Sequence, residues 1–263
     1  MSNAFAITNL QHADCFSALF QHVKLFSEHI NLIFDENKMY IQCMDSSKVS
    51  VFEIFLPKEW FDSYELADNA SSTIGISASM LFKVLNTRDK KQEIMFSFES
   101  EGDSIIINFQ CDDKNTYNKE FALPLMDIES EIMNIPEMES TADISLPSVN
   151  FANAVKDMRL FGDTFNLSCD QENLTMSANS DESGKMKLKI TTDDLTSYEI
   201  EEDAELKTSY SLNILYNISL YNKLSEFIHF HVKDGFPLKI VYELDNEIEG
   251  AKIAFFIAPK IDE

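Results

Sequence analysis

The strongest constraint on the fold is an internal duplication, because the chain matches itself when it is shifted by about half its length. A shift of 135 aligns the following pairs: Phe16 with Phe151, Leu25-Phe26 with Leu160-Phe161, and Asn31-Leu32 with Asn166-Leu167. A shift of 134 continues the match further along: Ser77 with Ser211, Leu81 with Leu215, and Ile94 with Ile228. In a chain of 263 residues, a repeat of this length predicts two domains of the same fold.

Each repeat carries the same order of local patterns. Apolar stripes with helical spacing predict helices at 12–26 and 149–161, and shorter second helices at 78–86 and 212–222. Most of the remaining chain alternates between apolar and polar residues, as at Ile94, Phe96 and Phe98. Alternation with one polar face is typical of antiparallel sheets. The predicted fold class is therefore α+β, with helices on one face of antiparallel sheets in each of two similar domains.

The repeats are joined by a segment that begins at Pro124 and reaches Pro136. Proline neither donates to a sheet ladder nor continues a helix, so the segment is predicted to be an extended connector. Its many aliphatic residues and methionines indicate that part of it packs, and part is offered to a partner. The predicted organisation is an N-terminal domain at 1–124, a connector at 125–139 and a C-terminal domain at 140–263.

The charge pattern contains a conflict. With 21 basic and 45 acidic residues the formal charge is −24, which opposes binding to polyanions unless the cations are gathered on one surface. The acids favour predicted strands and loops. The cations in or next to the predicted helices are Lys24, Lys83, Arg88, Lys156, Arg159 and Lys223. This distribution suggests a shared positive surface on the helices.

The cysteines, the N-terminus and the lengths of the apolar runs bear on the compartment of the protein. The four cysteines are isolated, which favours a reducing compartment over a disulfide framework. The N-terminus lacks the pattern of a signal peptide, and no apolar run approaches the roughly 18 residues of a membrane span, so no membrane partner is expected.

The sequence contains no recognisable catalytic motif. The chain has no glycine-rich phosphate loop and no nucleophile elbow, so we expect a protein that is not an enzyme and has no cofactor or bound metal. His229 and His231 lie two residues apart on a predicted strand and leave a metal-dependent enzyme open as an alternative.

Several motifs resemble the eukaryotic-type DNA sliding clamps, the proliferating cell nuclear antigen family. They are Met44-Asp-Ser-Ser-Lys-Val-Ser50, Glu59-Trp-Phe-Asp-Ser-Tyr64, Leu125-Met-Asp-Ile128, Ile135-Pro-Glu137 and Ile257-Ala-Pro-Lys-Ile-Asp-Glu263, in the order and spacing of the family over essentially the whole chain. The resemblance implies a homotrimeric ring with pseudo-sixfold symmetry, in which helices line the hole and sheets form the outside.

The resemblance also implies a function: a processivity factor that encircles duplex DNA without reading its sequence. Lys24, Lys83 and Lys156 match basic hole-lining positions of the family, whereas Arg88, Arg159 and Lys223 are assigned from helix position alone. The chain departs from the family at hole positions that are usually basic, namely Ser17, Ala18, Asn86, Asn153 and Asn213. The alternative is a clamp-fold interaction scaffold, or a subunit of a mixed ring, with little direct role on DNA.

The family's partner site is a hydrophobic pocket beneath the connector, which receives aromatic-anchored peptides of DNA polymerases, clamp loaders, ligases and nucleases. The matching positions are Met44, Lys48, Val49, Val51, Met133, Ile135, Pro237, Phe256, Ile257, Ala258 and Pro259. Lys48, Met133 and Phe256 stand where the family has His, Leu and Tyr. Methionine and branched aliphatic residues form an adaptable apolar floor, which suits several partners.

Ring closure is expected through edge strands of neighbouring copies. The resemblance assigns Tyr117, Glu120 and Phe121 to one edge and Lys185, Lys187 and Lys189 to the other, so the edges carry opposite charge. Gln171 stands where the family carries a ubiquitin-acceptor lysine. The expected location is the nucleus, or a viral replication site in the cytoplasm if the chain is of viral origin.

Overall fold

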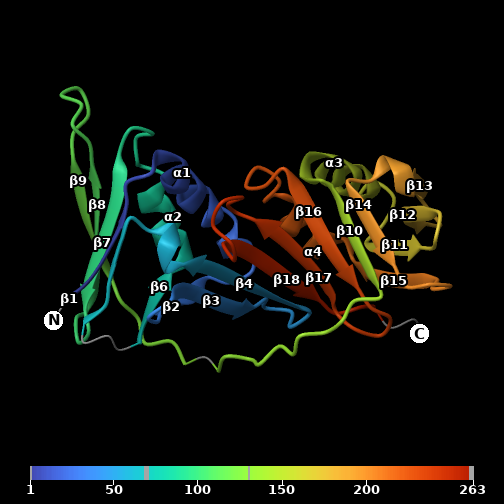
Figure 1. The fold of residues 1–263 in the computed structure, drawn as a ribbon, viewed down its shortest axis with the longest axis horizontal. Helices are drawn as coiled ribbons and strands as arrows, with labels where there is room; N and C mark the ends of the chain where they lie inside the picture. The colour runs from blue at the N-terminus through green and yellow to red at the C-terminus, as the bar shows by residue number, and fades with distance from the viewer. Residues whose placement is uncertain (1, 68–70, 130, 261–263) are drawn as a thin grey trace. The chain divides into compact units, whose positions relative to one another are not determined.

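The computed structural model describes residues 2–67, 71–129 and 131–260 (Figure 1). The chain forms two compact units. Unit 1 contains Met1–Ser46, Glu53–Met133 and Leu244–Lys252, and unit 2 contains Ser47–Phe52, Asn134–Glu243 and Ile253–Glu263. None of the helices in the described part combines the length and the apolar character that a membrane crossing requires.

Within its described residues, the first half of the chain supplies two α-helices and nine strands. Its elements are β1 (Ser2–Ile7), α1 (Leu10–Leu19), η1 (Val23–Leu25), β2 (His29–Phe34), β3 (Lys38–Met44), β4 (Ser50–Pro57), η2 (Lys58–Trp60), β5 (Ser63–Glu65), β6 (Ser72–Ser77), α2 (Ala78–Leu85), β7 (Glu93–Glu99), β8 (Ser104–Gln110) and β9 (Lys119–Pro124).

The second half repeats this order. Its elements are β10 (Ala142–Pro147), α3 (Ser148–Met158), β11 (Thr164–Cys169), β12 (Asn173–Ser180), β13 (Gly184–Thr191), η4 (Thr192–Asp194), β14 (Ser197–Ile200), β15 (Leu206–Ser211), α4 (Leu212–Ser219), β16 (Phe227–Val232), β17 (Leu238–Glu243) and β18 (Lys252–Ile257).

The pairing of the strands confirms the duplication. The order β5-β1-β7-β8-β9 reappears as β14-β10-β16-β17-β18, and the order β6-β2-β3-β4 reappears as β15-β11-β12-β13. Each strand of the first half thus corresponds to the strand nine places later. The registered pairs are antiparallel throughout, so the predicted fold class, two similar α+β domains, is correct.

The prediction of one helix over 12–26 is wrong in its extent. Asn9 caps α1 by accepting from the backbone N–H of Gln11, but the helix ends at Leu19 and a short 3-10 turn, η1, follows. Within the helix, the Ser17 hydroxyl donates to the Ala13 carbonyl at 2.8 Å, a contact that competes with regular helical bonding. The buried apolar residues that were predicted to lie on one helix are therefore divided between α1 and the short turn around η1.

Aromatic rings fill the core of unit 1. Phe5 lies at its centre, with ring centroids 4.5 Å from Phe34, 4.7 Å from Tyr64 and 5.1 Å from Phe96. Trp60 is buried beside this cluster and stacks on His12 with an interplanar angle of 8°. Such ring pairs add to the stability that apolar burial provides.

The core of unit 2 is organised by α3. Phe151 projects from this helix and meets Phe230 of β16 at 5.0 Å and Phe165 of β11 at 6.4 Å. The helix therefore covers the apolar face of the strands, as predicted, and leaves their other face to solvent or to partners.

Candidate functional site

The predicted basic set lies on or next to the helices, on the side away from each core. Lys24 follows α1 in η1, Lys83 lies in the last turn of α2, Lys156 lies in the last turn of α3, and Lys223 follows α4; all four side chains are exposed. Asn86, Asn153 and Asn213 are exposed among them as neutral residues. The helix surfaces of both units thus carry few but accessible lysines.

Arg159 is exposed and partly engaged. It caps α3, and its guanidinium lies 4.0 Å above the ring of Tyr216 on α4. A cation over an aromatic face keeps its charge, so Arg159 remains available to an anion while it joins the two helices.

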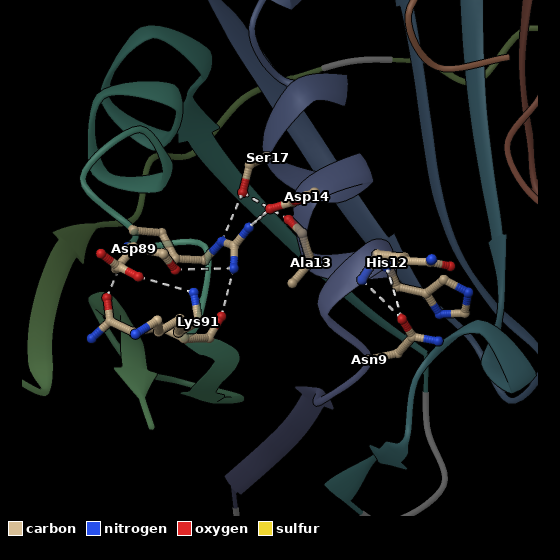
Figure 2. A network of polar contacts seen from close by, with 10 residues as sticks. Asn9, His12, Ala13, Asp14, Ser17, Asp89 and Lys91 are labelled. Carbon is tan, nitrogen blue, oxygen red and sulfur yellow. Dashed lines mark hydrogen bonds and ion pairs between the residues drawn. The ribbon is translucent and has the colours of Figure 1, made fainter. Parts of the chain in front are cut away.

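Arg88 does not match its assignment as a residue that faces DNA. Its side chain is only 3 % exposed and forms an ion pair with Asp14 of α1. The guanidinium also donates to the Gln92 carbonyl at 2.6 Å and to the Asp89 carbonyl at 3.2 Å. Figure 2 shows Asp14 and Ser17 pointing from α1 towards the loop that holds Asp89 and Lys91. Arg88 is therefore not counted among the cations that are available to DNA. Its ion pair with Asp14 instead joins α1 to the segment that follows α2.

We predict that Arg88→Gln lowers the free energy of unfolding by about 1–3 kcal/mol, because a buried charged donor and its bonds are lost. The slope of log affinity for linear duplex DNA against log salt concentration should be unchanged. Denaturant unfolding and fluorescence anisotropy measure the two quantities.

Lys83→Gln is the matched control for Arg88→Gln, because it removes an exposed cation from α2, the helix that precedes Arg88. It should reduce the salt slope by about 1 and leave stability nearly unchanged. If both variants reduced the salt dependence of DNA affinity equally, Arg88 would have to contact DNA as Lys83 does.

The connector runs across the outer face of unit 1 as an extended chain. The Met126 N–H donates to the Gly75 carbonyl of β6 at 2.9 Å, and Asn31 of β2 donates through its side chain to the Ile128 carbonyl at 3.0 Å. Gln42 of β3 then holds the backbone of Met133 from both sides, at 2.7 and 2.9 Å. Sequence reasoning missed these three residues, although Asn31 was conspicuous as part of the internal repeat.

Gly75 is required where the connector first crosses the sheet. A Cβ atom at this position would lie 2.3 Å from the Met126 carbonyl oxygen and 2.8 Å from the Ile128 side chain. Beyond this crossing Ile132 is 57 % exposed, so part of the connector packs and part is presented outwards, as predicted.

In unit 2, β18 presents alternate residues to opposite faces. Phe255 and Ile257 are fully buried, and Phe255 meets Tyr221 with ring centroids 5.4 Å apart. Phe256 is half-buried and points to the other face, and Ala258 is exposed and donates from its N–H to the Val49 carbonyl at 2.9 Å. Ile257 is therefore a core residue, and its assignment to the peptide pocket is wrong. A strand cannot offer two consecutive side chains to the same face.

The other predicted pocket residues divide between the units. Unit 1 contributes Met44, which is 39 % exposed, and the half-buried Met133. Unit 2 contributes Lys48, Val49, Val51, Ile135, Pro237, Ala258 and Pro259 in addition to Phe256. Lys48 is exposed and adopts a positive φ of 59° in the turn before β4. Their common role as a peptide pocket remains a proposal.

Both strands assigned to ring closure are edge strands. β9 pairs with β8 alone, and β13 pairs with β12 alone, within the described residues of this chain. Glu120 is exposed on β9 and Phe121 is half-buried, while Tyr117, just before the strand, is 87 % exposed. Lys185, Lys187 and Lys189 are exposed along β13. The structure thus places the two residue sets at or next to edges that pair with no further described strand of this chain, with Glu120 beside Lys119 on β9 and three lysines on β13.

The two histidines of β16 are engaged with the neighbouring strand. His231 Nδ1 lies 2.6 Å from Asp143, and His229 Nδ1 lies 2.6 Å from the Ser145 hydroxyl. Burial lowers the pKa of His229. In the described part of the chain, no three His, Cys, Asp or Glu side chains are grouped to hold a metal ion, so the metal-enzyme alternative gains no support.

Comparison with known proteins decides the family. The family model described as "Proliferating cell nuclear antigen, N-terminal domain" matches residues 7–132, and the C-terminal domain model matches residues 134–260. The chain belongs to the proliferating cell nuclear antigen family.

Relatives of this family match nearly end to end at low identity. The proliferating cell nuclear antigen of Dictyostelium discoideum is 24 % identical over 259 residues, which cover 96 % of this chain and 98 % of that protein. The Caenorhabditis elegans protein of the same name is 24 % identical and covers 87 % of this chain and 86 % of its own length. A protein named "DNA polymerase sliding clamp" from Methanococcus maripaludis is 24 % identical over 87 % of this chain and 88 % of its own.

Membership of the proliferating cell nuclear antigen family agrees with the doubled topology. The N-terminal model covers the first repeat from the end of β1 to beyond β9, and the C-terminal model covers β10 to β18. At 24 % identity, individual site residues of this chain are supported only by its own geometry.

Proposed function

We propose that this chain is a DNA sliding clamp, a polymerase processivity factor that encircles duplex DNA and docks replication proteins. The observation that carries the proposal is the doubled fold, which the two family models cover from residue 7 to 132 and from 134 to 260. In both repeats the helices cover the apolar side of the strands and present exposed lysines on their outer surface. The chain acts as a non-catalytic tether in the nucleus, or at a viral replication site in the cytoplasm if it is of viral origin.

The DNA contact is electrostatic and sparse. After the removal of Arg88, the available cations are Lys24, Lys83, Lys156, Arg159 and Lys223. Lysine and arginine contacts to phosphates provide affinity without sequence readout, and the affinity falls with salt. A closed ring tolerates a weak contact, because encirclement rather than affinity keeps it on DNA.

The proposed docking surface is the outer face of β18 in unit 2. Phe256, Val49 and Ala258 offer an aromatic ring, an aliphatic side chain and a backbone carbonyl followed by Pro259. A partner peptide with aromatic anchors could bury its rings there and donate a hydrogen bond to the Ala258 carbonyl. Polymerases, clamp loaders, ligases and nucleases are the proposed carriers of such peptides.

The ring is proposed to close by antiparallel pairing of β9 with β13 of the next copy. We expect light scattering after size exclusion to give a mass of about 90 kDa, three times the 30.1 kDa of one chain. Rising salt should weaken the assembly, because Glu120 and the β13 lysines attract each other across the contact. A mass of 30 kDa at micromolar concentration would instead favour the interaction scaffold or the mixed ring, for which the sparse basic set is the motivating observation.

A further inference from the structure

The outer face of the sheet β13-β12-β11-β15 in unit 2 carries lysines and no acid. The strand registers place the following side chains on this face: Thr164, Asn166, Ser168, Asn173, Thr175, Ser177, Asn179, Lys185, Lys187, Lys189, Thr191, Lys207, Ser209 and Ser211. We call this set the lysine face. It lies opposite the side that α3 covers, because Phe165, which meets Phe151 of α3, points the other way. In a chain of charge −24, such a face is unexpected, and it contradicts the prediction that strands carry the acids.

The four lysines are solvent-exposed and spread over the width of the sheet. Lys185, Lys187 and Lys189 follow one another along β13, and Lys207 lies on β15, at the opposite edge. The register joins Lys189, Thr175, Ser168 and Lys207 in one row across the strands. With a strand spacing of about 4.8 Å, this row spans roughly 14 Å. The hydroxyl and amide groups between the lysines can hydrogen-bond a polar ligand.

Internal symmetry shows what kind of ligand crosses a face of this type. The equivalent face in unit 1, on β6-β2-β3, is crossed by the connector, an extended acidic segment that includes Asp127, Glu129 and Glu131. Eight residues, Met126 to Met133, are enough to run from β6 to β3. Its backbone bonds to Gly75, Asn31 and Gln42, whose equivalents in unit 2 are Ser209, Asn166 and Ser177.

Within the described residues, unit 2 reproduces the first step of this crossing. The Lys260 N–H donates to the Ser209 carbonyl at 2.7 Å, as the Met126 N–H donates to the Gly75 carbonyl at 2.9 Å, and 126 plus 134 is 260. No described segment continues over Asn166 and Ser177. Asn166 instead accepts from the Ser209 hydroxyl at 2.9 Å, within its own sheet.

We propose that the lysine face binds an extended acidic polypeptide segment of a partner protein. The segment would cross the strands along the path that the connector takes in unit 1. Its carboxylates would meet the lysines, and its backbone would bond to the hydroxyl and amide groups between them. The site goes beyond the clamp function and is separate from the Phe256 surface.

Duplex DNA fits this face less well. Acids stand in the turns at both ends of the strands, with Asp170 and Glu172 at one end and Asp181 and Glu182 at the other. A narrow chain can lie between these turns, whereas a wide duplex would approach them and be repelled. The face also has no aromatic ring on which the bases of a single strand could stack.

The proposed contact is compatible with ring closure through β13. Edge pairing uses the backbone N–H and C=O groups in the plane of the sheet, whereas the lysine side chains project out of it. Lys207 separates binding on the lysine face from ring closure, because it belongs to the lysine face but lies on β15, away from the β13 edge.

The test uses fluorescence anisotropy of the full chain with a twelve-residue peptide that alternates glutamate and serine. This probe has no apolar anchor that could occupy the peptide surface around Phe256. A second peptide, in which glutamine replaces glutamate, controls for charge, and a twelve-nucleotide oligothymidine tests nucleic acid. Residues 261–263 stay unchanged in every variant.

We expect the acidic peptide to bind more weakly, by about tenfold, to the triple variant Lys185→Gln, Lys187→Gln, Lys189→Gln. Lys207→Gln alone should weaken binding by about twofold while the mass in light scattering stays unchanged. The matched helix variant Lys24→Gln, Lys83→Gln, Lys156→Gln should bind like the unmodified chain. Added salt should weaken binding, because the lysines are exposed.

Three results would overturn the proposal. They are equal binding of the acidic and the neutral peptide, equal loss in the helix variant, and binding of oligothymidine without binding of the acidic peptide. None of them bears on the clamp function, which the oligomeric mass and the helix lysines test separately.

Discussion

Replacing Phe256 with serine should weaken the binding of an aromatic-anchored polymerase tail peptide by at least about 30-fold, because removal of an aromatic hot spot costs about 2 kcal/mol or more. Phe256 is half-buried on the outer face of β18, where its ring is available to a ligand. Isothermal calorimetry with a synthetic tail peptide measures the loss. The protein should keep its fold and its oligomeric mass.

The neighbouring residue has to be left intact in this experiment. Ile257 is fully buried, so serine there would remove core packing, and a loss of binding could then reflect unfolding. Phe161→Ser is a suitable control, because Phe161 is a half-buried phenylalanine of the same unit that follows α3. Unchanged affinity in Phe256→Ser would refute the peptide-surface assignment, as would an equal loss in Phe161→Ser.

Reversing the charge of Lys24, Lys83 and Lys156 should reduce clamp-stimulated DNA synthesis to nearly the level without clamp. Replacing these three lysines with glutamate lowers the net charge of each chain by six on the surface that we assign to DNA, so phosphates would be repelled where they were held. Primer extension on linear primed DNA is the appropriate assay, because a ring can thread onto free ends without a loader.

The control for this triple variant reverses three lysines outside the four α-helices and η1, namely Lys58, Lys114 and Lys233, which changes the net charge by the same amount. It should support synthesis almost normally at physiological salt, where exposed charges are screened beyond about 8 Å. Full stimulation by the helix variant would show that those lysines do not face DNA. Loss in both variants would show that only net charge matters.

Most of the fold could be predicted, because the sequence contains an internal repeat in which each half carries the same pattern. Matches such as Phe16 with Phe151 and Asn31 with Asn166 can be seen by comparing one stretch of the sequence with another, without any knowledge of contacts. They predict two domains with the same order of helices and strands. Alternation likewise placed Ile94, Phe96 and Phe98 in the core, where the structure has them. The first helix was predicted too long, because Phe20, Val23 and Phe26 are buried by a turn and a 3-10 element that give almost the same apolar spacing.

The site was harder to predict, because it depends on pairs of residues that are distant in sequence. Arg88 follows a helix and looked like a free cation, but its partner Asp14 lies 74 residues earlier. The resemblance named Ile257 with Phe256, and only the direction of each side chain on β18 separates a core residue from a surface one. The lysine face was overlooked because Lys207 joins the β13 lysines only through the register of four strands.

The single tryptophan of the chain has a practical consequence for anyone who studies its unfolding. Trp60 is buried in unit 1 against His12, and unit 2 has no tryptophan. Its emission therefore follows the melting of one half of the molecule alone, while far-ultraviolet circular dichroism follows both halves. Comparing the two melting curves measures how strongly the halves cooperate, without any added label.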